Sequence, residues 1–138
     1  MGTGRVWWTR AIAGAVLAFA PACGDSGGDA PETVDCDRQP PLDWDNFGEG
    51  FFALHCTSCH SAENSNVQRS GAPIGLDFDT YSEVVREVSR IETVATGDDA
   101  AMPPSGSEPS EAERTMLNEW LDCAVWPDHD ALEANGGL

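Results

Sequence analysis

Residues 48–60 read GEGFFALHCTSCH. The last five of them, Cys56-Thr57-Ser58-Cys59-His60, form the most informative motif of the chain. Two cysteines three positions apart, followed at once by a histidine, bring two sulfur nucleophiles and one imidazole to a single turn of the chain. Proteins use this spacing in redox-active dithiols, in zinc sites and in the covalent attachment of haem. The rest of the sequence has to decide between these three kinds of site.

The surroundings of the motif favour haem. A thioredoxin-like dithiol follows a strand in a βαβ pattern, and strand signals are weak throughout this chain. A zinc site needs a second pair of ligands, whereas Cys36 and Cys123 are single and far apart. In covalent haem sites the two cysteines form thioethers to the two vinyl groups, and the histidine then faces the iron. We therefore predict one haem c, bound by Cys56 and Cys59, with His60 as an iron ligand.

Three segments of helical periodicity surround the motif, at residues 45–55, 80–91 and 110–124. The second and third segments each open with a Ser or Thr that has Glu three residues later, which is typical of a capping box. Loops containing Gly and Pro, at 61–79 and 96–109, separate the three segments. The predicted apolar faces are Phe47, Phe51 and Leu54, then Tyr81, Val84, Val85, Val88 and Ile91, then Ala112, Met116, Leu117, Trp120, Leu121 and Ala124. These patterns predict a small all-α domain with three main helices.

The first 22 residues have the pattern of an export signal. Arg5 and Arg10 precede ten uncharged, Ala-rich residues at 11–20, a run too short to span a bilayer. The small residues at 20–22 are typical of ordinary signal cleavage. Cys23, which is followed by the small or acidic residues 24–26, instead resembles the lipidated first residue of a bacterial lipoprotein. We favour the lipoprotein and keep a free periplasmic or secreted protein as the alternative. In either case we expect a location in the periplasm or cell envelope, with membrane contact only through a lipid anchor.

The mature chain divides into three parts. Residues 23–43 are rich in Gly, Pro and acidic side chains, which predicts a flexible tether. Residues 44–127 contain the motif and the three helices, and residues 128–138 are predicted to form a C-terminal tail. A core of three helices is thin, and domains of this size often gain stability from a disulfide, a metal or a cofactor.

The charge balance excludes several functions. The chain of 138 residues has 24 acidic and 7 basic side chains, a net charge of −17, so we expect no binding to a nucleic-acid backbone. It contains no lysine, which excludes a P-loop and a lysine nucleophile. The acidic residues could select a basic partner, or they could form an ordinary solvated surface. We favour the solvated surface, because the acidic residues are spread along the whole mature chain.

In these features the chain resembles the small class I cytochromes c, over about residues 44–127. Gly48, Phe52 and Cys56 reproduce the glycine, aromatic and cysteine spacing with which that family approaches its haem motif. In that fold the glycine lets the first helix cross the last one closely, and Trp120 is the matching aromatic of the last helix. The resemblance therefore implies a cytochrome c fold around one covalent haem.

The resemblance also implies the remaining contacts of the haem. Met102, in a Pro-rich loop before the last helix, is the expected second axial ligand, whereas Met116 lies on an apolar helix face and is expected in the core. Pro73 lies near the position of the proline whose carbonyl accepts the ligand histidine's N–H in that family. His55 lies on the same side as Cys56 and is not expected to bind the iron. His129 follows the last predicted helix in a Pro- and Asp-rich segment, where a solvent-exposed side chain is expected.

Two cysteines, Cys36 and Cys123, are left over. In an oxidising compartment two remaining thiols usually pair, and the first and last helices cross in the cytochrome c fold. A disulfide between them is therefore predicted, with two unpaired thiols as the alternative.

These observations predict an electron-transfer protein rather than an enzyme. With both axial positions of the iron filled, no substrate binds the metal. We expect a monomer whose partners are other redox proteins, a group that could include basic ones. A haem-based gas sensor or a haem enzyme in which the methionine dissociates is the alternative. Residues 96–106 place no histidine or arginine over that face, which disfavours catalysis. A subunit docked on a larger dehydrogenase or oxidase is a third possibility.

Overall fold

The computed structural model describes residues 34–97, 99–104 and 106–137. These residues belong to one compact unit, Glu32–Leu138. The described part of the chain contains helices and loops and no strand, which confirms the all-α prediction. The predicted signal peptide, residues 1–22, and the predicted lipidation site at Cys23 lie outside the described residues.

The first helical segment consists of a π-helical turn, η1 (Trp44–Gly48), that continues into α1 (Glu49–His55). Asp43 begins it with a capping box, because its carboxylate accepts from the Asn46 N–H at 2.8 Å and the Asn46 side chain accepts from the Asp43 N–H at 3.0 Å. The buried face of α1 carries Phe51, Phe52 and His55. Leu54, which the periodicity placed on the apolar stripe, is 64% exposed.

The second segment is two short helices, α2 (Tyr81–Arg86) and α3 (Val88–Ala95). The predicted capping box is present, with Thr80 as N-cap and Glu83 accepting from the Thr80 N–H at 2.9 Å. The helix is interrupted at Glu87, whose φ of −107° and ψ of 12° lie outside the α-helical region. Its apolar face is buried except for Tyr81, which is partly buried. Because valine has a low helix propensity, packing outweighs propensity here. The buried residues are Val84, Val85, Val88, Ile91 and Ala95.

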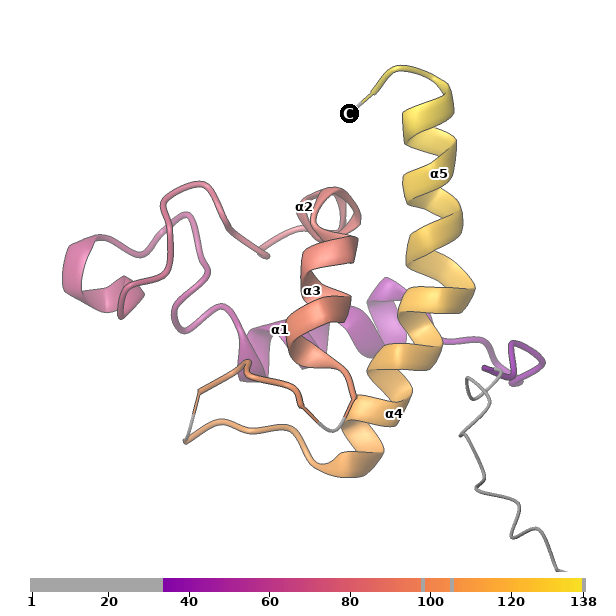
Figure 1. Ribbon diagram of the computed structural model, residues 1–138, viewed down its shortest axis with the longest axis horizontal. Helices are drawn as coiled ribbons and strands as arrows, with labels where there is room; N and C mark the ends of the chain where they lie inside the picture. The colour runs from indigo at the N-terminus through magenta and orange to yellow at the C-terminus, as the bar shows by residue number, and fades with distance from the viewer. Residues whose placement is uncertain (1–33, 98, 105, 138) are drawn as a thin grey trace, which may run out of the picture. The chain divides into compact units, whose positions relative to one another are not determined.

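The third segment is longer than predicted. It runs through α4 (Glu111–Trp120), the π-helical turn η3 (Leu121–Val125) and α5 (Trp126–Ala134), seen as one continuous rod in Figure 1. The predicted tail at 128–138 is therefore wrong over most of its length. Pro127 does not stop the helix, because it occupies the first turn of α5, where a missing N–H costs little.

α5 is held against α2. The Tyr81 hydroxyl donates to the Asp128 carboxylate at 2.7 Å. His129 packs edge-on against Trp126 with ring centroids 5.1 Å apart, and its side chain is only 14% exposed. The expectation of a solvent-exposed His129 is therefore wrong as well.

Gly48 marks the close approach of the first and last helical segments. A Cβ on Gly48 would lie 2.8 Å from ring carbons of Trp120 and 2.8 Å from the Trp44 ring, so no larger residue fits without movement. This confirms the predicted contact between Gly48 and Trp120. Trp120 itself is fully buried and, with Phe52, is among the largest side chains of the core.

The segment before the first helix is fastened to the domain. Cys36 and Cys123 are joined as predicted, with Cα atoms 5.5 Å apart. The guanidinium of Arg38 pairs with the Glu119 carboxylate, and Leu42 packs against the core. The prediction of a flexible tether through residue 43 is therefore wrong for its last part, because three separate contacts attach residues 36–42.

Two long loops complete the fold. Residues 56–80 include one turn of 3₁₀-helix, η2 (Asn66–Arg69), and residues 96–110 connect α3 to α4. In Figure 1 the first of these loops extends away from α3 on the side opposite to α5. Within the described part of the chain, no helix combines the length and the apolarity that crossing a bilayer demands.

Candidate functional site

A cavity of about 710 Å³ lies between the two loops and the helices α1 and α3. Its volume is in the range of cavities that hold small molecules and cofactors. All four residues predicted to hold the haem line it, namely Cys56, Cys59, His60 and Met102. Much of the remaining wall is apolar, including Phe51, Phe52, Leu76, Phe78, Ile91, Val94, Ala95 and Pro103. The structure thus brings residues from both predicted loops to one apolar cavity.

The cysteine motif forms a turn that continues from the end of α1. The N–H groups of Cys56 and Thr57 both donate to the Phe52 carbonyl at 2.9 Å, and those of Cys59 and His60 donate to the Cys56 carbonyl at 3.1 and 2.9 Å. Burial raises the pKa of the Cys56 thiol to about 12. A thiol with so high a pKa is protonated at neutral pH, unlike the thiolates of redox-active dithiols.

The His60 ring is oriented by a backbone carbonyl. Its Nδ1 lies 2.9 Å from the Leu76 carbonyl oxygen, and since a carbonyl can only accept, Nδ1 carries the proton. The lone pair of Nε2 is then available to a metal. The ring also packs against Phe78, with centroids 5.0 Å apart. The hydrogen bond to Leu76 therefore fixes the orientation of the His60 ring, as the corresponding bond does in histidines that bind metals.

The acceptor for His60 was predicted at the wrong residue. Pro73 lines the cavity, but its carbonyl accepts from Arg69 Nη2 at 2.5 Å, and the carbonyl that accepts from His60 belongs to Leu76. Arg69 explains the difference, because its guanidinium binds the Pro73 carbonyl and a later carbonyl, that of Leu76, faces the histidine.

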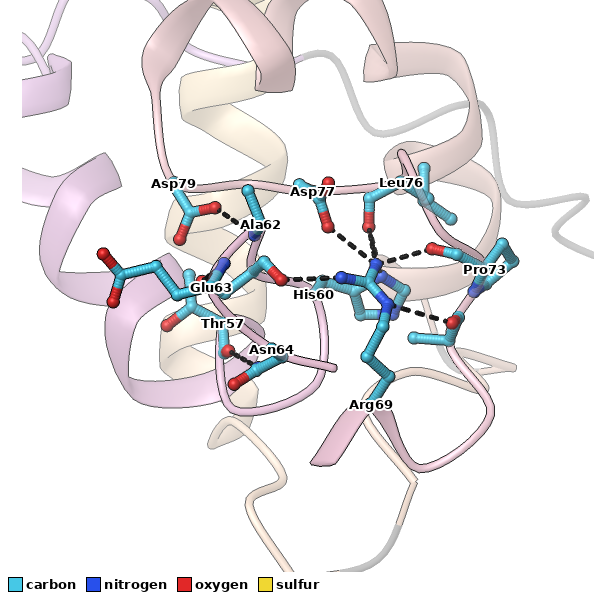
Figure 2. Close-up of polar contacts among 12 residues, drawn as sticks. Thr57, His60, Ala62, Glu63, Asn64, Arg69, Pro73, Leu76, Asp77 and Asp79 are labelled. Atoms are coloured by element: carbon cyan, nitrogen blue, oxygen red, sulfur yellow. Dashed lines mark hydrogen bonds and ion pairs between the residues drawn. The ribbon is translucent and has the colours of Figure 1, made fainter. Parts of the chain in front are cut away.

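Arg69 organises the loop around these carbonyls. Figure 2 shows its guanidinium between Pro73, Leu76 and Asp77, with the Asp77 carboxylate 2.6 Å from Nη2. A second nitrogen donates to the Ser61 carbonyl at 2.6 Å. The loop thus folds around a buried cation rather than around apolar side chains.

Further hydrogen bonds attach this loop to the cysteine motif. The Asn64 side-chain amide donates to the carbonyls of Thr57 and Ser58 at 2.8 and 3.0 Å (Figure 2 shows the first). The Phe78 N–H donates to the His60 carbonyl at 3.0 Å. The motif and the loop therefore form one hydrogen-bonded unit that fixes the position of His60.

Met102 is held by its backbone on the other wall. Its N–H donates to the Val94 carbonyl at 2.8 Å, and its carbonyl accepts from Arg114 Nη1 at 3.0 Å. The same Arg114 nitrogen donates to the Ala95 carbonyl at 2.7 Å, so α4 and the end of α3 together fix this point of the loop. Met102 is 41% exposed, and its thioether is a soft ligand suited to haem iron.

His55 connects α1 to the loop that carries Met102. Its Nδ1 donates to the Ser107 carbonyl at 2.7 Å, and its Nε2 lies 3.5 Å from a Glu113 carboxylate oxygen. Hydrogen bonds from Ser110, and then the nearby His55, hold the pKa of Glu113 below its usual range. His55 therefore joins two elements, and its Nδ1 is already used in doing so.

Sequence reasoning missed several residues of the site. Leu76 acts through its backbone, which no residue pattern reveals, and Arg69 looked like one polar residue among others in a loop. Arg114 had a signal, since a cation in the first turns of a helix opposes the helix dipole and suggests another role. Arg90 also lines the cavity from α3, although residues 96–106 alone had offered no arginine.

The donor set fits a covalently bound haem better than zinc. Two thiols on one turn, an imidazole with its Nε2 available and a thioether on another wall are the donors that such a haem uses. Among the described residues, the donor atoms that converge within 4.8 Å of one another are those of His129, Asp130 and Glu133. Cys56, Cys59 and His60 are not part of such a cluster among the described residues, whereas a zinc site needs several donor atoms this close together.

Comparisons with models of protein families, with curated protein sequences and with solved structures found no match to this chain. Its function therefore has to follow from the geometry of its own residues.

Proposed function

We propose that this protein carries single electrons on one haem c, attached through Cys56 and Cys59, with His60 and Met102 as the axial ligands of the iron. The observation that carries the proposal is the convergence of these four side chains on one apolar cavity, from loops more than forty residues apart in sequence. The resemblance of the motif and of the Gly48–Trp120 contact to class I cytochromes c supports the same conclusion.

The chemistry divides between the group and the chain. When bound, the haem would supply a one-electron couple of its iron. The chain orients His60 through the Leu76 carbonyl and lines the cavity with the aromatic side chains of Phe51, Phe52 and Phe78. A thioether ligand such as Met102 raises the reduction potential relative to a second imidazole. Both axial positions would be filled, which suits electron transfer rather than catalysis.

The proposed setting is outside the cytoplasm. The export signal pattern supports it, and so does the disulfide between Cys36 and Cys123, since such bonds persist in oxidising compartments. We propose a monomer in the periplasm or cell envelope, anchored through a lipid on Cys23, whose partners are other redox proteins.

A second function deserves a test because Met102 is 41% exposed. A gas sensor or haem enzyme would release this methionine and open the iron to a ligand. Arg90 and Ser107 line the same cavity and could then contact a bound molecule.

Optical spectroscopy separates the two functions. The oxidised protein should show the far-red band of methionine bound to ferric haem, and the reduced protein should resist carbon monoxide. A reversible one-electron titration without any substrate would complete the support for electron transfer. Rapid carbon monoxide binding by a protein that lacks the band would replace electron transfer by sensing.

A further inference from the structure

Arg69 is a buried cation next to the proposed proximal ligand. Its side chain is 5% exposed, and burial of a guanidinium is costly unless its donors find acceptors. Nε donates to the Ala72 carbonyl at 3.2 Å, and the carbonyls and the carboxylate described above take the other nitrogens. With its donors occupied in this way, the guanidinium is fixed in place.

One of these acceptors is the carbonyl that orients the histidine. The Leu76 oxygen lies 2.9 Å from His60 Nδ1 and 3.3 Å from Arg69 Nη2. The two N–H groups of Nη2 also reach the Pro73 carbonyl at 2.5 Å and the Asp77 carboxylate at 2.6 Å, so Leu76 is the third and longest contact of this nitrogen. A carbonyl oxygen has two lone pairs and can accept from both donors at once. Two donors that share one acceptor oxygen compete for its electron density, so the charged guanidinium weakens the hydrogen bond from His60.

We propose that Arg69 is a positioning residue that raises the reduction potential of the haem by sharing the Leu76 carbonyl with His60. This inference rests on the proposed function. A strong acceptor at Nδ1–H makes an imidazole ligand more basic and favours ferric iron, whereas a weakened acceptor favours ferrous iron. The fixed positive charge beside the cavity acts in the same direction, because little solvent screens it.

Asp77 opposes this effect and provides a test of sign. Its carboxylate lies 2.6 Å from Arg69 Nη2, and its side chain is 12% exposed. Removing the charge of Asp77 leaves the guanidinium uncompensated, so it draws more electron density from the Leu76 oxygen and weakens the hydrogen bond from His60 further. Removing the charge of Arg69 leaves the Asp77 carboxylate uncompensated. The Leu76 oxygen then accepts from His60 alone, and that hydrogen bond becomes stronger. The two substitutions should therefore move the potential in opposite directions.

The experiment measures the midpoint potential of the full-length haem protein in five forms: wild type, Arg69→Gln, Arg69→Lys, Asp77→Asn and Arg86→Gln. Arg86→Gln removes the same charge from an exposed position on α2 and serves as the matched control. We expect Arg69→Gln to lower the equilibrium constant for reduction about tenfold, which is about 59 mV for one electron. Asp77→Asn should raise the potential, Arg69→Lys should restore most of the wild-type value, and Arg86→Gln should change little.

The His60 Nδ1–H resonance of the reduced protein gives a readout that loop disorder would not mimic. It should move downfield in Arg69→Gln, where the hydrogen bond to Leu76 strengthens, and upfield in Asp77→Asn. Shifts of potential in the same direction for both variants, or no shift in either, would overturn the inference. A wild-type protein without covalent haem would instead contradict the proposed function, so the two failures are distinguishable.

Discussion

Gly48 lies so close to the indole of Trp120 that a methyl group in its place would come within 2.8 Å of two ring carbons. The ring cannot retreat easily, because Trp120 is fully buried and has Phe47 and Phe52 against it, with centroids 6.0 and 6.2 Å away. The contact joins the first helical segment, which leads to the cysteine motif, to the last one. The position of the motif therefore depends on a glycine twelve residues before His60.

Replacing Gly48 by alanine should destabilise the protein. The added methyl group overpacks the crossing, and such changes typically cost about 1–3 kcal/mol. Gly50→Ala is the matched control, since Gly50 lies in α1 with nothing within 4 Å of an added Cβ. That substitution should be neutral or stabilising by up to about 1 kcal/mol, because alanine is the better helix former. Equal effects of the two substitutions in urea unfolding would show that the contact does not restrict the crossing.

Opening the disulfide should lower stability while leaving the site intact. Its two cysteines are 87 positions apart in sequence, and removing a bond that closes so long a loop typically costs about 2–4 kcal/mol. The double substitution Cys36→Ala with Cys123→Ala should therefore lower the free energy of unfolding by that amount and still bind haem. Loss of haem at temperatures where the variant is folded would assign these cysteines a role in the site itself.

Arg114 should stabilise the binding of Met102 to the iron. Arg114→Gln removes the charged donor to the Met102 and Ala95 carbonyls, which should cost about 1–3 kcal/mol of stability. Because the loop then moves more freely, the far-red methionine band should weaken and carbon monoxide should bind faster to the reduced protein. Arg86→Gln again provides the control, and an unchanged band in Arg114→Gln would contradict this role.

Met102 should be the methionine that decides access to the iron. Met102→Ala should abolish the far-red band, lower the reduction potential and allow carbon monoxide to bind. Met116→Leu, a conservative change at a partly buried position of α4, should leave all three properties close to those of the wild type. If Met102→Ala kept the band, another residue would be the axial ligand.

The capping carboxylate of α4 should make stability depend on acid. The pKa of Glu113 in the folded protein is lowered by Ser110 and then by His55, so the ionised form is favoured in the folded state. Its contribution is fully present above the unfolded pKa of about 4.3 and is lost as the pH falls through the lower folded value. Glu113→Gln keeps the capping geometry without the charge, so its stability difference from the wild type should shrink below that pH. A difference that stays constant between pH 7 and pH 3 would contradict the linkage.

The helices were predictable because their signals are local. Capping boxes at Thr80 and Ser110 gave two helix starts correctly, and the periodic valines gave the buried face of α2 and α3. The end of the last helix was not predictable from Pro127, because a proline in the first turn of a new α-helix is tolerated after a π-helical turn.

The sequence was sufficient to predict four residues that line the cavity. It was not sufficient to predict the residues that hold these four in place. Cys56, Cys59 and His60 are close together in the sequence, so their spacing can be recognised without knowledge of the fold. The carbonyl of Leu76 and the loop folded around Arg69 depend on backbone conformation, which side-chain patterns do not encode. The supports of the site therefore had to come from the structure.

Covalent attachment of one haem through Cys56 and Cys59 would change both the mass and the absorption spectrum of the protein. The full-length protein would be expressed with export and haem attachment in a bacterial host, and its intact mass would be determined together with a pyridine haemochrome spectrum. We expect a mass increased by one haem, the haemochrome of a haem with two thioether bonds, and loss of both in the Cys56→Ala, Cys59→Ala double variant. A correctly exported wild-type protein with two free thiols at these positions and no bound haem would contradict the account.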